Sequence, residues 1–103
     1  MAVVSGFLVA GEVGKLIQMT QPGVDLSAAN SLTIVAMPPS GGAPLELVAG
    51  YVNDPVLGEM AQYATTGSDF TMPGLWTLQL WVRFTDGQLL KAIQQAVQVY
   101  SSL

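Results

Sequence analysis

The clearest pattern of apolar and polar positions lies between residues 74 and 87. Apolar side chains occupy every second position, in the order Trp76, Leu78, Leu80, Val82 and Phe84. The positions between them are polar except for one large aromatic, and they hold Thr77, Gln79, Trp81 and Arg83. Because successive side chains of a strand point to opposite faces, this period predicts a strand whose first set lies in the core. The second set, Trp81 included, is then predicted to face outward.

Shorter runs of the same kind follow one another along the chain, separated by turn sequences. The turns contain Gly, Pro, Asn or Asp and fall at residues 21–23, 38–42, 53–55, 65–69, 72–74 and 85–87. The runs are of strand length and span residues 3–10, 15–20, 31–37, 45–52, 57–64 and 75–84. Regular turns with short runs between them are typical of all-β sandwiches and barrels. We expect an all-β fold, an antiparallel β-sandwich of about seven strands, in a single domain spanning residues 1–103.

The segment after the TDG turn carries two patterns. Gly87 suits a tight hairpin in which it takes a positive φ, and a hairpin requires an antiparallel strand after the turn. Residues 88–100 also place apolar side chains at helical spacing, namely Leu89, Ile93, Ala96, Val97 and Tyr100. We favour a strand with a bulge near Leu89 and Leu90, because the preceding strand would otherwise have an open edge. A helix is the alternative, and it would cover the outward face and place Trp81 in the core.

Composition adds an expectation about assembly. Half of the residues are apolar and only 10% are charged, with three basic and seven acidic side chains. Globular domains are on average about a quarter charged. With so few charges and a net charge of −4, part of the surface is expected to be covered by other subunits. We therefore expect a homo-oligomer or another multi-copy assembly, with a monomer of neutral polar surface as the alternative.

Charge and hydropathy also argue against several partners. The basic residues Lys15, Arg83 and Lys91 are scattered, so no positive stripe is expected to bind nucleic acid. No apolar run approaches the ~20 residues of a membrane-spanning helix, so no membrane partner is expected. The first eleven residues lack the basic start of a signal peptide and are interrupted by Gly6 and Gly11. We expect synthesis in the cytoplasm.

Candidate chemistry is limited to carboxylates. The chain has no histidine and no cysteine, so the usual nucleophile and base pairs and imidazole or thiolate metal sites are lacking. Six acidic residues lie in or beside predicted turns, where such side chains commonly cap their own backbone. They are Asp25, Glu46, Asp54, Glu59, Asp69 and Asp86. We expect a protein that is not an enzyme, with no catalytic, cofactor-binding or metal-binding residues.

A family resemblance rests on the order of several short motifs. VDLSAANSLTIVAMPPSGG at residues 24–42 is followed by a long strand, then Tyr63, TTGSDF at 65–70, a Pro-Gly step, Trp76, the alternating strand and TDG. Over residues 24–99 this order resembles small Ig-like β-sandwich domains of tailed-phage virion proteins, such as the N-terminal domain of phage upper-baseplate proteins. The resemblance implies a structural subunit of a tail, baseplate, neck or fibre attachment. Its partners would be other virion structural proteins and its location the virion.

Two other functions stay open beside that one. A capsid decoration or cement protein would use exposed apolar strands in the same way. A carbohydrate-binding or adhesion module would use Trp81, with Tyr51, Tyr63 or Tyr100, as stacking surfaces.

The candidate interface consists of Trp81, Arg83 and Gln79. Interfaces are enriched in Trp and Arg, which favours contact with another subunit for an outward Trp81. Coverage by a loop of the same chain is the main alternative, and sugar stacking is the third.

Overall fold

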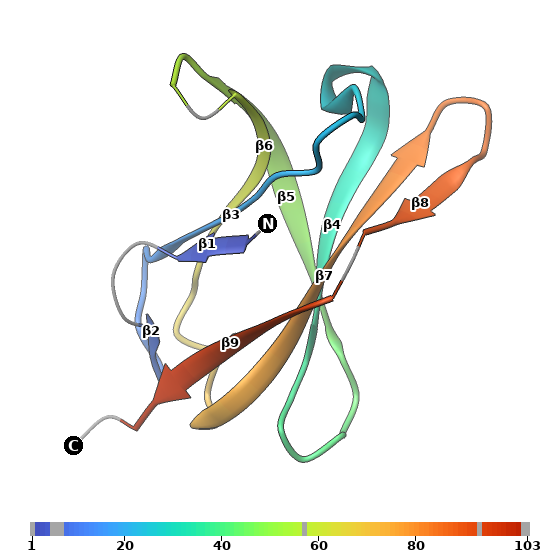
Figure 1. Ribbon diagram of the computed structural model, residues 1–103. Helices are drawn as coiled ribbons and strands as arrows, with labels where there is room; N and C mark the ends of the chain where they lie inside the picture. Colours follow the sequence, from blue (N-terminus) through green and yellow to red (C-terminus); the bar gives the residue numbers. More distant parts are fainter. Residues whose placement is uncertain (1, 5–7, 57, 93, 102–103) are drawn as a thin grey trace.

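The computed structural model describes residues 2–4, 8–56, 58–92 and 94–101, and strands dominate this part of the chain (Figure 1). The strands are β1 Ala2–Val4, β2 Leu8–Val9, β3 Leu16–Met19, β4 Ala29–Met37, β5 Leu45–Asp54, β6 Gly58–Ala64, β7 Gly74–Phe84, β8 Leu89–Lys91 and β9 Gln95–Tyr100. A single turn of 3-10 helix, η1 Leu26–Ala28, precedes β4. The predicted all-β fold is confirmed.

The described residues form nine strands, whereas about seven were predicted. The excess comes from the two ends, because the predicted run 3–10 contains β1 and β2, and the last run contains β8 and β9. Strand β1 pairs with β3, whereas β2 pairs with β9. Strands β8 and β9 both pair with β7. The predicted segments also include residues 5–7, Leu57 and Ile93, which lie outside the described residues.

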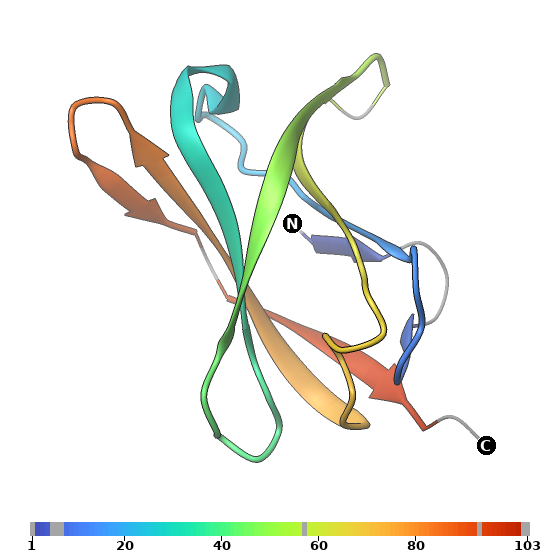
Figure 2. The same cartoon turned by 180° about the vertical axis from the view of Figure 1, so that it is seen from behind.

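The strands form one continuous hydrogen-bonded path in the order β1-β3-β6-β5-β4-β7-β9-β2, with β8 beside β7. Neighbours run antiparallel except β2 and β9, which are parallel. Figures 1 and 2 show that this sheet curls strongly along its length. The architecture is therefore a curled sheet that wraps around its core.

Strand β5 is the place where the sheet turns from one half to the other. Residues 45–49 pair with β4, and residues 50–54 pair with β6. Figure 2 shows β5 passing from beside β4 to beside β6 along its length. Gly50 begins the second half, and a glycine inside a strand commonly marks such a bend.

The core is built on the inward face of β7. Trp76, Leu78, Leu80 and Val82 are buried, and Phe84 is half-buried against them, as the alternation predicts. Residues from both halves of the sheet complete the same cluster, including Ile17, Met19, Leu32, Ile34, Ala36, Ala61, Phe70 and Val99. One core therefore joins the two halves.

Trp76 occupies a specific place in this core. Its ring meets Phe70 edge to face, with 4.9 Å between centroids. Its indole N–H donates a hydrogen bond of 2.8 Å to the carbonyl oxygen of Met72. The polar end of the side chain is thus satisfied by the loop that precedes β7 while the ring is buried.

The TDG sequence forms the hairpin turn between β7 and β8. The N–H of Gly87 donates to the carbonyl of Phe84 at 3.1 Å, and the N–H of Phe84 donates to the carbonyl of Gln88 at 2.9 Å. Gly87 has a φ of +92°, which residues with a side chain rarely adopt. The predicted positive φ is confirmed, in a three-residue hairpin loop.

After this turn the chain forms strands, so the helical alternative for residues 88–100 is wrong at 89–91 and 95–100. The predicted bulge is displaced, because Leu89 and Leu90 pair regularly with β7. Trp81 pairs with Lys91 and Leu78 pairs with Gln95, so the chain has one extra residue between β8 and β9 relative to β7. Because of this extra residue, the inward side chains have even numbers before it, at Leu90 and Ala92, and odd numbers in β9, at Val97 and Val99.

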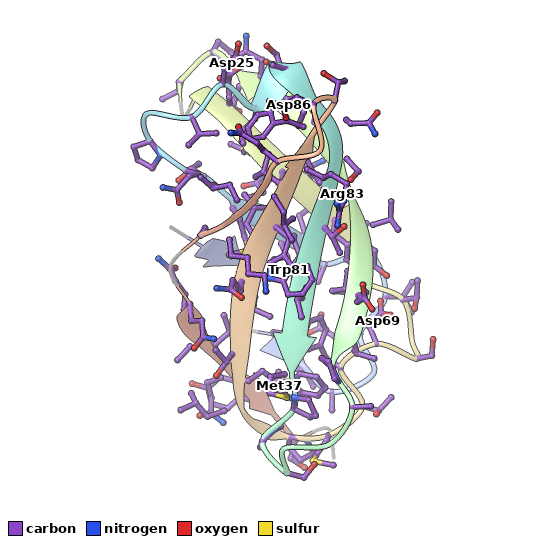
Figure 3. All side chains as sticks on the ribbon, turned by 90° about the vertical axis from the view of Figure 1, so that its right-hand side faces the viewer. Asp25, Met37, Asp69, Trp81, Arg83 and Asp86 are labelled. Carbon is purple, nitrogen blue, oxygen red and sulfur yellow. The ribbon has the colours of Figure 1, made fainter. Side chains whose placement is uncertain are left out.

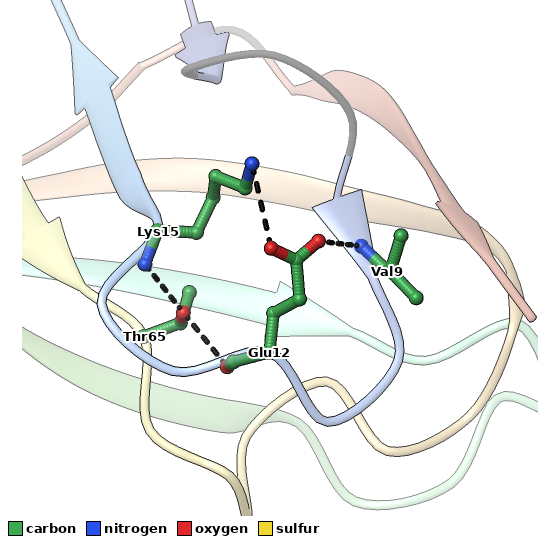
Figure 4. A network of polar contacts seen from close by, with 4 residues as sticks. All are labelled: Val9, Glu12, Lys15 and Thr65. Atoms are coloured by element: carbon green, nitrogen blue, oxygen red, sulfur yellow. Dashed lines mark hydrogen bonds and ion pairs between the residues drawn. The ribbon is translucent and has the colours of Figure 1, made fainter. Parts of the chain in front are cut away.

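A polar network fastens the segment between β2 and β3 to the end of β6 (Figure 4). The hydroxyl of Thr65, a buried side chain, accepts from the N–H of Lys15 at 3.1 Å and donates to the carbonyl of Glu12 at 3.0 Å. The Glu12 carboxylate accepts from the N–H of Val9 at 2.8 Å and forms an ion pair of 3.4 Å with Lys15. Two backbone hydrogen bonds run beside it, from Thr65 to Lys15 and from Gly14 to Thr65.

We expect Trp76→Ala to lower the free energy of unfolding by about 3 to 5 kcal/mol, because it removes a buried ring and leaves a cavity. A domain of this size has only about 5 to 15 kcal/mol in total. Urea denaturation measures the loss. Leu75→Ala is the matched control, since Leu75 is the exposed neighbour on the same strand. Equal losses in the two variants would contradict the assignment of faces.

We expect Thr65→Val to cost about 1 to 3 kcal/mol, because it leaves the N–H of Lys15 and the carbonyl of Glu12 short of a partner. The side chain keeps its volume, so the loss reports the hydroxyl. Thr66→Val is the control, because Thr66 is exposed and its hydroxyl contacts that of Ser68. A thermal or urea melt of both variants decides the matter, and a stable Thr65→Val would show that the network adds nothing.

Candidate functional site

The outward side chains of four neighbouring strands form a surface centred on Trp81. Cross-strand pairing places Thr33 of β4 on one side of Trp81 and Lys91 of β8 on the other. The next strand continues the row with Val48 of β5. We call this surface the Trp81 face, and its residues are Thr33, Val35, Met37, Glu46, Val48, Thr77, Gln79, Trp81, Arg83, Leu89 and Lys91.

Figure 3 looks onto the Trp81 face, with Arg83 toward one end and Met37 toward the other. The predicted interface residues Trp81, Gln79 and Arg83 are all on this face, as alternation along β7 requires. Gln79 and Trp81 are half-buried and Arg83 is exposed.

Side chains of the same chain hold the Trp81 ring in place. Its indole N–H donates to the side-chain oxygen of Gln79 at 2.9 Å, and the amide nitrogen of Gln79 donates to the carbonyl of Ala92 at 2.7 Å. The ammonium nitrogen of Lys91 lies 4.3 Å from the ring centroid, a cation–π distance. Trp81 is therefore a fixed, half-buried ring on an outer surface, and its partial coverage comes from side chains of its own and the adjacent strand.

A hollow of about 190 Å³ lies beside this ring. Apolar and polar groups line it together: Val35, Met37, Pro44, Glu46, Thr77, Gln79, Trp81 and Gln94. Ligand sites commonly combine an apolar wall with a few polar groups that fix orientation. The hollow could receive one side chain of a partner or one small polar ligand.

Apolar side chains around the hollow are strongly exposed. Val48 is 80% exposed and Met37 40%. Leu89 is also exposed at the other end of the face, and Leu75 and Tyr100 extend the same side of the sheet onto β9. These exposed apolar side chains share one side of the sheet, and exposed apolar surface beside polar groups is a feature of interaction sites.

Sequence reasoning missed much of this surface. Glu46 was expected in or beside a turn, but it lies within β5 and points outward beside Val35. Glu59 was expected there too, but it lies within β6. Val48, Met37 and Lys91 had no local signal, because which residues share a face across strands depends on register.

The predicted capping role of the aspartates is confirmed at four positions. Each accepts a hydrogen bond from a backbone N–H of its own turn: Asp25 from Ser27 at 3.1 Å, Asp54 from Val56 at 2.8 Å, Asp69 from Thr66 at 2.7 Å and Asp86 from Gln88 at 2.9 Å. The hydrogen bond from the Ser27 hydroxyl is the main cause that holds the pKa of Asp25 below its ordinary value.

Two tyrosines donate hydrogen bonds to carboxylates away from the Trp81 face. Tyr63 donates to Asp69 at 2.6 Å and Tyr51 to Glu59 at 2.8 Å. Burial, followed by the hydrogen bond to Asp69, raises the pKa of Tyr63 to about 12. The hydrogen bond to Glu59 raises the pKa of Tyr51. A phenol held in its neutral form is a poor base or nucleophile, so these pairs fix loops and strands.

Within the described ranges, no three acidic side chains lie close enough together to hold a metal ion. None of the described helical structure is long and apolar enough to span a membrane. Comparison of the sequence with protein-family models gives no match, and comparison with curated proteins gives none either.

The raised pKa of Tyr63 predicts a change of stability at high pH. An unfolded tyrosine loses its proton near pH 10, whereas folded Tyr63 does so near 12. Between these values the unfolded state binds fewer protons, so stability present below pH 10 falls as the pH rises. We expect Tyr63→Phe to lose less stability across this window than wild type, measured by urea denaturation at stepped pH. Parallel curves for the two proteins would contradict this role.

Proposed function

We propose that this protein is a non-enzymatic structural subunit that acts through protein–protein contacts of the Trp81 face in a symmetric, multi-copy assembly. The observation that carries the proposal is a fixed tryptophan on an outer surface, beside a hollow and among exposed apolar side chains. Trp and Arg are the residue types most enriched at the energetic centres of interfaces. A pre-ordered ring also loses little side-chain freedom on binding.

The charges on this face support a protein partner. Arg83, Lys91 and Glu46 are its charged members, and Lys91 packs on the ring of Trp81. Arg83 and Glu46 lie away from the central row, as polar groups at the rim of an interface do. The ring of Trp81 would be covered by a partner that excludes water from it.

We place this subunit in a bacteriophage particle, in a tail, baseplate, neck or fibre attachment, with other virion structural proteins as partners. The order of strand pairing supports the Ig-like part of this proposal. In Ig domains one sheet has the order ABED and the other CFG. The order β1-β3-β6-β5 corresponds to the first, and β4-β7-β9 to the second. A capsid decoration protein would use the same surface, and the copy number per particle, measured by mass spectrometry of purified virions, separates the two.

Carbohydrate binding is a second candidate, favoured by the hollow itself. Trp81 lies there beside the carboxylate of Glu46 and the amides of Gln79 and Gln94, groups suited to sugar hydroxyls. The expected sugar-binding surface combined Trp81 with Tyr51, Tyr63 or Tyr100, and none of these tyrosines is among the described residues that line the hollow. The protein-contact proposal therefore ranks first.

We expect Trp81→Ser to leave the isolated domain folded, with a stability loss of about 1 kcal/mol, because Trp81 packs outside the core. Its association with partner subunits should weaken on the order of tenfold or more, as truncation of a central interface Trp does. Thermal melting measures the first effect, and sedimentation with purified particles measures the second. Tyr51→Ser is the control, since Tyr51 is an exposed aromatic on the other half of the sheet.

Two outcomes would contradict the proposal. If Trp81→Ser destabilises the domain as much as Trp76→Ala, Trp81 serves the chain's own core. If binding to a glycan panel is lost while sedimentation with particles is unchanged, the face serves carbohydrate recognition.

A further inference from the structure

The Trp81 face carries three charged side chains, Arg83, Lys91 and Glu46, and none of them forms an ion pair within the described ranges. The ion pair among the described residues joins Lys15 and Glu12, away from this face. Lys91 lies against the ring of Trp81. Arg83 and Glu46 are exposed, and neither has a hydrogen bond or ion pair within the described ranges. A partner on this face must therefore meet charges of both signs, among which Arg83 and Glu46 are held by no polar contact of the described chain.

Register places these two charges on opposite sides of the centre of the face. Trp81, Thr33 and Val48 form the middle row across β7, β4 and β5. Arg83 lies on β7 one outward position to one side of this row, and Glu46 lies on β5 one outward position to the other. With strands about 4.8 Å apart and outward positions about 6.8 Å apart, the two are separated by roughly 16 Å. They cannot pair within one chain.

This diagonal arrangement is self-complementary. We consider a two-fold axis that lies parallel to the face above Thr33 and is perpendicular to the line from Arg83 to Glu46. Rotation about this axis brings Arg83 of one copy onto Glu46 of the other. The same rotation brings Glu46 of the first copy onto Arg83 of the second, as in any isologous contact. It also lays Trp81 of each copy over the region between Val35 and Gln79 of the other, beside the hollow. One operation therefore pairs both charges and covers the ring.

We propose that the partner of the Trp81 face is a second copy of this chain, in an isologous dimer with two reciprocal Arg83–Glu46 ion pairs. The inference rests on the proposed function and names the partner of that same surface. A purely acidic partner would leave Glu46 repelled, and a purely basic one would leave Arg83 repelled. A second copy satisfies both, although each chain has a net charge of −4.

The size of the surface sets the expected strength. A standard interface covers about 800 Å² of each partner, roughly a seventh of the 5774 Å² exposed here. The Trp81 face has eleven residues, fewer than the roughly 20 to 30 of a standard interface. We therefore expect a small interface with a dissociation constant in the micromolar range, roughly 1 to 100 μM.

The test is sedimentation velocity of the full chain from about 1 to about 300 μM, a range that brackets this affinity. Arg83→Glu and Glu46→Arg each place like charges together twice per dimer, and each should weaken association on the order of tenfold or more. An equimolar mixture of the two variants should associate like wild type, because one chain then presents two acidic groups and the other two basic groups. Rescue on mixing is the signature of reciprocal pairing.

Glu59→Arg is the control, a charge reversal of the same size on β6; it removes the acceptor of the Tyr51 hydroxyl, and it should leave association unchanged. Thermal melts confirm that every variant is folded. A wild-type protein that stays monomeric at the highest concentration, or a mixture that associates no better than the single variants, overturns the inference. In either case, loss of particle binding by Trp81→Ser would still support the proposed function with a different partner. Dimerisation with rescue, but without particle binding, would support the inference and contradict the virion setting.

Discussion

The alternation of side chains along β7 is the constraint on which the rest of the structure depends. Trp76 and Trp81 are five residues apart on one regular strand, so they cannot share a face. The inward face already holds Trp76 with three fully buried aliphatic side chains. Burial of these four side chains contributes several kcal/mol and fixes the register of the strand. Trp81 faces outward as a consequence of that choice.

The neighbours of β7 extend this division across the molecule. Strand β4 pairs with β7 over most of its length, which aligns Leu32, Ile34 and Ala36 with the core and Thr33 and Val35 with the outer face. Strand β5 adds Glu46 and Val48 to the outer face before it turns to pair with β6. The sheet curls around its inward side, and the described strands form no second layer over the outward side. The exposed apolar side chains of the Trp81 face follow from that geometry.

The parts of this arrangement that depend on local sequence could be predicted. Alternation identified the faces of β7, and the chemistry of the turn identified the positive φ of Gly87. The aspartate caps also depend on neighbours two or three residues away. All of these signals lie within a few residues of the position that they describe.

The parts that depend on register or distant contacts could not be predicted. The place of Glu46 on the Trp81 face follows from pairing between β4 and β5, and the division of β5 at Gly50 follows from pairing with β6. Thr65 is fixed by partners that are 50 and 53 residues away in sequence. The change of register between β8 and β9 alters which side chains face inward. In each case the deciding neighbour comes from another strand or loop.

The central claim is that one strand presents a tryptophan to the core and another to a surface that a partner covers. Acrylamide quenching of fluorescence, in Trp81→Phe and Trp76→Phe proteins that each retain one tryptophan, tests it most directly. The account predicts that Trp76 is shielded at every protein concentration. It predicts that Trp81 is quenched in dilute protein and becomes shielded as the concentration rises or when particles are added. Equal shielding of the two rings in dilute protein, or a Trp81 that stays open under all these conditions, would contradict it.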